Sequence, residues 1–197
     1  MDTHRKVKRL YAKGLSGSEI SEKVDIHIRQ VYRILEKLGV SRRTSAEQNK
    51  IRFLRSPSSY KFKENCLSKD RDLLIAGLML YYGEGAKTNR TVDFANSDVR
   101  MLKIFIKFLR VICGVQEKRL RFYLYYFSDQ DPKKLINFWS KELKADKDSF
   151  TKPHVRKVYD NLHRRMPYGV LHIRYSDLRL LNKILSLNLK ISENMLE

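Results

Sequence analysis

One carboxylate stands between two glycines at the end of an apolar run, in the segment GLMLYYGEGAK. The acid is Glu84, the glycines are Gly83 and Gly85, and Lys87 follows. Carboxylate and backbone oxygens hold Mg²⁺ in proteins, and the ion can activate water for phosphodiester hydrolysis. We therefore expect a Mg²⁺ site at Glu84 and Gly83, with Lys87 and Arg174 stabilising a scissile phosphate.

Three further residues are candidates for the same chemistry. Arg90 is another cation that could contact a phosphate, and Asp93 and Asp98 are alternative metal ligands. Asp98 also fits the first turn of a helix, and Asp93 the outward side of a strand. The simpler interpretation of Glu84 is a solvated residue in a turn. The five histidines lack the HExxH spacing of zinc metalloproteases, so the sequence does not predict that catalytic site.

The charge of the chain indicates a polyanionic partner. Its 197 residues include 41 Lys and Arg against 22 Asp and Glu, a formal net charge of +19, while 42% are hydrophobic. Such a folding chain favours nucleic acid, because neutralising phosphates releases counterions. The longest apolar stretch, residues 73–82, is too short to span a bilayer, so we expect no membrane partner. Cys66 and Cys113 lack metal-ligand spacing, which favours an intracellular, cytoplasmic protein.

Residues 1–43 show three short helical patterns. Ser16 and Glu19 form a capping box that starts the second helix, and Asp25 lies in the turn before the third. The third helix, residues 27–38, is apolar on one side and basic on the other. The polar residues of this helix and its end are His27, Arg29, Gln30, Arg33, Lys37, Arg42 and Arg43.

A short helix, a tight turn and a basic second helix form the layout of a helix-turn-helix, whose second helix enters the major groove of DNA. The segment resembles the helix-turn-helix of resolvase-type recombinases, with Asp25 in place of the usual glycine. Asp tolerates the left-handed conformation that this turn needs. The resemblance implies that these polar residues contact DNA. The alternative is a packing module of three helices with a solvated basic side.

Residues 44–68 are expected to form a basic linker to a second domain, residues 69–197. Ser68 is placed to cap a helix over 69–82, which carries small residues along one side. Further along, the patterns predict strands at 91–97, 118–128 and 169–176, and helices at 98–113, 132–143 and 177–187.

The second and third of these strands alternate between apolar and polar residues. Their outward residues are Arg119, Arg121, Tyr123, Tyr125, His172 and Arg174. Arginine suits phosphates and aromatic rings suit bases, so this side is expected to contact DNA. The alternative is a pair of edge strands with solvated charges.

The segment LLIAGLMLYYGEG resembles the LAGLIDADG motif of homing endonucleases and related regulators, an apolar helix that ends in Asp-Gly or Glu-Gly. The match places Glu84 at the acidic position, while Tyr81 and Tyr82 stand where an earlier acid is usual. The resemblance implies an α+β protein with an αββαββα core whose sheet faces DNA. Because the chain has one copy of the motif, it also implies a homodimer through the 69–82 helix. The interface residues would be Ala76, Gly77, Leu80 and Gly83.

The sequence therefore predicts a protein that binds double-stranded DNA at a specific sequence and cleaves it with Mg²⁺ as a homing-type endonuclease homodimer. The alternative is a transcriptional regulator whose LAGLIDADG-like domain does not cleave, which the two tyrosines favour. A third interpretation is an RNA-binding or intron-splicing protein, since the resemblance implies that activity too.

Overall fold

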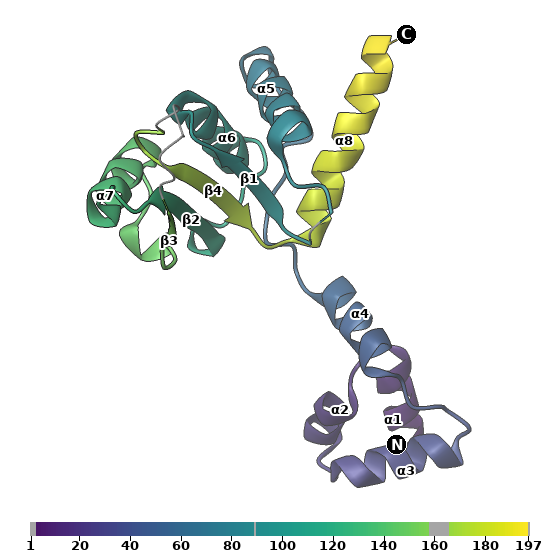
Figure 1. Cartoon of the computed structure of the whole chain (residues 1–197). Helices are drawn as coiled ribbons and strands as arrows, with labels where there is room; N and C mark the ends of the chain where they lie inside the picture. Colours follow the sequence, from purple (N-terminus) through teal and green to yellow (C-terminus); the bar gives the residue numbers. More distant parts are fainter. Residues whose placement is uncertain (1–2, 89, 158–165, 197) are drawn as a thin grey trace. The chain divides into compact units, whose positions relative to one another are not determined.

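The computed structural model describes residues 3–88, 90–157 and 166–196 and forms two compact units, Met1–Pro57 and Ser58–Glu197 (Figure 1). Each unit has a hydrophobic core of its own. The described residues contain helices and a mixed four-stranded sheet, so the predicted α+β class is confirmed. Among them no helix is both long and apolar enough to cross a membrane.

The first unit is built from helices. They are α1 (Thr3–Ala12), α2 (Gly17–Val24), α3 (Ile28–Lys37) and α4 (Ser45–Arg55). The predicted capping box is present: the Glu19 amide donates to Ser16 Oγ, and the Ser16 amide donates to the Glu19 carboxylate. Asp25 adopts the left-handed conformation, with φ of 54°, and so makes the turn between α2 and α3.

The helix α4 belongs to the first unit rather than to a linker. Arg55 donates to the Gly14 carbonyl at 2.9 Å, and Gln48 donates to the same carbonyl at 3.3 Å. Gly14 has a φ of +85°, and a β-carbon there would meet the Ile51 side chain. Of the predicted 44–68 linker, the part through Pro57 therefore lies in the first unit.

The second unit contains the sheet and its helices. The helices are α5 (Ser68–Glu84), α6 (Val99–Val111), α7 (Pro132–Leu143) and α8 (Leu178–Leu196), with two short 3₁₀ turns, η1 (Glu117–Arg119) and η2 (Lys147–Ser149). The strands are β1 (Val92–Asn96), β2 (Leu120–Phe127), β3 (His154–Arg156) and β4 (Val170–Tyr175). They lie in the order β1-β4-β2-β3, with β2 and β3 parallel and the other pairs antiparallel.

One face of this sheet is buried. The inward residues of the three longer strands, among them Phe94, Phe122 and Ile173, join a core to which α5, α6, α7 and α8 also contribute. Figure 1 shows α6 behind the strands and α5 and α8 beyond β1. The opposite face carries the outward residues that the alternation predicted, and we call it the open face.

Residues 58–68 are tied to the second unit by a buried polar network. The Ser59 hydroxyl donates to the Asp177 carboxylate at 2.5 Å, and the Tyr175 hydroxyl donates to the Ser59 carbonyl. Asp177 also accepts from the backbone amides at the start of α8. Burial raises the pKa of Asp177, but these hydrogen bonds outweigh it and lower the pKa.

Several predicted boundaries need correction. The helix α5 runs to Glu84 and α8 to Leu196, which is two and nine residues past their predicted ends. Leu67, not Ser68, precedes the first turn of α5, and no side chain caps it. The helix α6 separates the first two strands, so the order of elements differs from αββαββα.

Candidate nucleic-acid interface

The open face is organised in cross-strand rows. Asp93 of β1 pairs with Arg174 of β4, which pairs with Arg121 of β2. In the next row, His172 of β4 pairs with Tyr123 of β2. Because side chains alternate along a strand, these residues point to the same side of the sheet. The alternation in the sequence thus predicted their placement.

Asp93 is the polar centre of this face. Its side chain is 9% exposed; Oδ2 accepts from Arg174 Nε at 2.7 Å, and Oδ1 lies 2.9 Å from His172 Nδ1. Burial raises the pKa of this carboxyl, but the hydrogen bond and charge of His172 and the charge of Arg174 outweigh burial and lower the pKa. Asp93 is an outward strand residue, as expected, and it holds two basic side chains.

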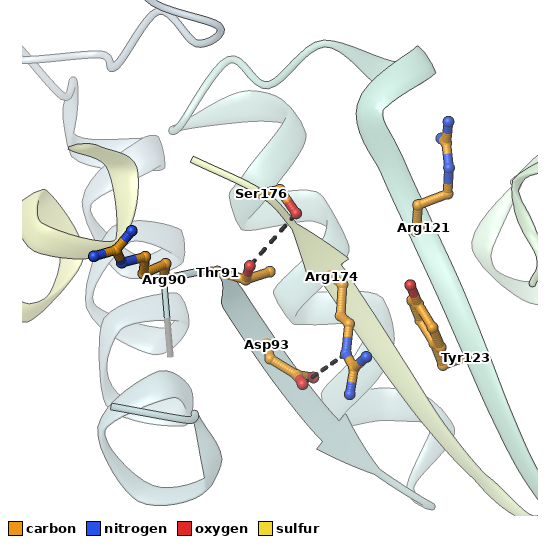
Figure 2. A pocket seen from close by; sticks show the side chains of 7 residues that line it. All are labelled: Arg90, Thr91, Asp93, Arg121, Tyr123, Arg174 and Ser176. Carbon is orange, nitrogen blue, oxygen red and sulfur yellow. Dashed lines mark hydrogen bonds and ion pairs between the residues drawn. The ribbon is translucent and has the colours of Figure 1, made fainter. Parts of the chain in front are cut away.

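A pocket of about 340 Å³ opens beside this carboxylate. Its lining residues are Arg90, Thr91, Asp93, Arg121, Tyr123, Arg174 and Ser176 (Figure 2). The Arg174 guanidinium carbon lies 4.1 Å from the centre of the Tyr123 ring. Arg90 and Arg121 lie on opposite sides of the pocket in Figure 2. The pocket is therefore basic, with one neutralised arginine in the middle and two others at its border.

A second cluster surrounds Tyr125. The rings of His154 and His172 lie 5.2 and 4.9 Å from the Tyr125 ring, and the Arg156 guanidinium lies 5.1 Å from it. His154 and Arg156 belong to β3, which the sequence did not predict. This strand has only three residues and all are exposed, so it has no apolar alternation that could reveal it.

The exposed side of α3 forms a separate basic surface on the first unit. His27, Arg29, Gln30, Arg33 and Lys37 are all exposed, while Val31 and Leu35 are buried. His27 also caps the helix, because its Nδ1 accepts from the Arg29 amide at 3.2 Å.

Arg43, Arg119 and Arg121, which were predicted to contact DNA, donate hydrogen bonds within the chain. Arg121 donates to the carbonyls of Lys118 and Leu120 at 2.8 and 2.7 Å. Arg43 donates to the carbonyls of Tyr11 and Leu15 and lies over the Tyr11 ring at 3.9 Å, so it holds the end of α1. Arg119 lies in η1 rather than in the strand, and it donates to the Ser176 carbonyl. Arg42 is exposed and lies over the Tyr32 ring at 4.2 Å.

Glu84 is the last residue of α5 and is exposed. The next residue, Gly85, forms an antiparallel bridge with Phe94, so the acid lies beside the β1 edge of the sheet. Gly85 has an extended backbone, and a β-carbon there would meet Tyr81. The glycine is therefore needed for close packing rather than for a left-handed turn.

Lys87 and Arg174, predicted to act with Glu84 on a scissile phosphate, each contact another side chain of the chain. Lys87 lies over the Tyr82 ring at 5.8 Å, and Arg174 is bound to Asp93. Among the described residues, no group of three or more His, Cys, Asp or Glu side chains could hold a metal. Glu84 and Gly83 would supply one carboxylate and backbone oxygens to a Mg²⁺ ion.

The residues predicted for a dimer interface have different surroundings. A β-carbon on Gly77 would lie 2.1 Å from the Phe108 ring, so Gly77 faces α6 of its own chain. Ala76 and Leu80 are half-buried, and Leu80 packs against the core. Gly83 is exposed, and a β-carbon there would meet nothing within 4 Å. The close-packed side of α5 is thus occupied within the unit.

Comparison with known proteins gives no relative. No family model matches the sequence, and searches of curated proteins and of solved structures find no match.

Proposed function

We propose that the protein binds double-stranded DNA through two surfaces, the exposed side of α3 and the open face of the sheet. The observation that carries this proposal is the pocket on the open face, where Arg174 is braced and Arg90 and Arg121 stand at the border. Arginine at a border suits phosphates, and a braced arginine with neighbouring aromatic rings suits bases. The net charge of +19 supports a polyanionic partner.

The geometry of the first unit supports the same function. The helices α2 and α3 are joined by a left-handed residue, Asp25, and α3 buries one side while it exposes five polar residues beyond its cap. This arrangement supports a helix-turn-helix in which α3 is the recognition helix. We accordingly propose a helix-turn-helix in the first unit and a LAGLIDADG-like DNA-binding domain in the second.

Removing a border arginine should reduce the salt dependence of binding. Arg121→Ala deletes an exposed charge from the pocket, so the slope of log affinity against log salt should fall by about one unit. The measurement is fluorescence anisotropy with a duplex between low and physiological salt. Arg100→Ala is the matched control, because Arg100 is exposed on α6, which packs on the buried face. Equal slopes for wild type and Arg121→Ala would contradict the role of the open face.

A second candidate function is DNA cleavage, favoured by the exposed position of Glu84 beside the β1 edge. One chain supplies one such acid, so cleavage of both strands would need a homodimer. Glu84→Gln preserves size and removes the charge, so it should abolish Mg²⁺-dependent cleavage and leave DNA binding within a few-fold. The measurement is breakage of a randomised plasmid library with Mg²⁺ or Mn²⁺, followed by sequencing of ends. A wild-type protein that binds its site and never cuts would contradict cleavage. The proposal would then be the non-cleaving regulator.

A further inference from the structure

We infer that Arg174, braced by Asp93, reads the major-groove edge of a guanine. This inference rests on the proposed DNA binding and assigns one base-reading position within it. Arg174 lies on β4, between β1 and β2, so it stands in the middle of the open face.

The guanidinium of Arg174 is fixed from two sides. Its Nε donates to the Asp93 carboxylate at 2.7 Å, and its carbon lies 4.1 Å from the centre of the Tyr123 ring. Figure 2 shows the dashed contact to Asp93 on one side of the guanidinium and Tyr123 beyond the other. With Nε engaged by Asp93, the two Nη groups form a planar pair of donors beside Tyr123, whose side chain also interacts with the guanidinium. The side chain is 30% exposed, so this pair is accessible to a ligand.

The charges argue against a phosphate clamp at this position. Asp93 neutralises Arg174, and the carboxylate is fixed because His172 also contacts it at 2.9 Å. A neutralised arginine adds little to counterion release, which is the main benefit of a phosphate contact. Arg90 and Arg121 at the border are better placed for phosphates. Arg174 therefore keeps hydrogen-bond donors of fixed orientation, while Asp93 neutralises its charge.

Two parallel donors match a ligand with two adjacent acceptors. In duplex DNA the O6 and N7 atoms of guanine present that pattern in the major groove, which is wide enough for a two-stranded β-ribbon. A cytosine presents a donor there, and adenine and thymine present one acceptor each beside a donor or a methyl group. Guanine is therefore the base that the braced arginine fits.

The test uses the full chain and a duplex selected from a randomised library. Each guanine of the selected site is replaced in turn by 7-deazaguanine, which removes N7 and leaves base pairing intact. One replacement should weaken wild-type binding about 5- to 150-fold. The same replacement should cost Arg174→Ala nothing, because the paired donors are already lost in that variant. A guanine outside the protected site is the control base.

The Asp93→Asn variant distinguishes a role in base reading from a purely structural role. It removes a negative charge from a DNA-facing surface, so binding to unrelated DNA should stay equal or tighten. Discrimination at the Arg174 guanine should nevertheless fall, because the amide cannot hold the guanidinium in the same way. Melting curves of the variants confirm that they fold.

Two outcomes would overturn the inference. If no guanine is sensitive to 7-deazaguanine in the wild type, Arg174 reads no guanine. If Arg174→Ala weakens binding to all sequences equally and lowers the salt slope by about one unit, Arg174 is a phosphate clamp. A full chain that binds no duplex at all would overturn the proposed function together with this inference. The two outcomes above overturn only the inference, because the chain still binds DNA in both.

Discussion

Gly77→Ala will destabilise the second unit by about 1–3 kcal/mol, and Gly77→Leu will prevent it from folding. The added β-carbon would lie 2.1 Å from Cγ and 2.5 Å from Cβ of Phe108. These atoms are close to the α6 backbone, and Phe108 is completely buried against Phe105, so its ring cannot turn away. The clash must therefore be relieved by moving α5 from α6, which opens the core.

Gly83→Ala is the matched control on the same helix. A β-carbon at Gly83 would meet nothing within 4 Å, so alanine there should stabilise the helix by about 0.5–1 kcal/mol. The measurement is urea unfolding at two protein concentrations. A loss of stability in Gly77→Ala that disappears at the higher concentration would contradict the packing against α6 and support a dimer interface at Gly77.

Replacing both Arg29 and Arg33 by alanine will weaken binding to the selected DNA site by about 2–6 kcal/mol. Both side chains are exposed on α3, on the side opposite the buried Val31 and Leu35. Each arginine can form a paired contact with a base, and each such contact discriminates by about 1–3 kcal/mol. Binding to unrelated DNA should fall much less, because only phosphate contacts are lost there.

Arg52→Ala is the control for this double variant, since Arg52 is an exposed arginine of the same unit on α4. Competition binding with the selected site and an unrelated duplex gives both affinities. Equal losses on the two duplexes would reduce α3 to a phosphate-contacting surface and contradict its role in reading bases.

Local patterns in the sequence predicted much of the fold. A capping box depends on residues three apart, so Ser16 and Glu19 marked the start of α2. Strand alternation likewise depends on neighbours, so the pattern of residues 118–128 is enough to assign Arg121 to the outward side of β2. These features need no information about distant parts of the chain.

Other missed features depend on residues far apart in the sequence. Gly77 reads as a small residue in a helix, and only the fold places Phe108 against it. From the sequence, Arg43 is a basic residue available to DNA. Only the fold places the carbonyls of Tyr11 and Leu15 beside it. The pairing of Asp93 with Arg174 joins residues 81 positions apart. The candidate site was therefore predictable as a surface, while its internal contacts were not.

Hydroxyl-radical footprinting of the full chain on its selected duplex tests the central claim most directly. We predict two protected segments in the wild type, one made by α3 and one by the open face of the sheet. The Arg29→Ala, Arg33→Ala double variant should lose the first segment, and an Arg90→Ala, Arg121→Ala double variant should lose the second. Protection that either double variant leaves unchanged, or a single segment that both variants lose together, would contradict binding through two separate surfaces.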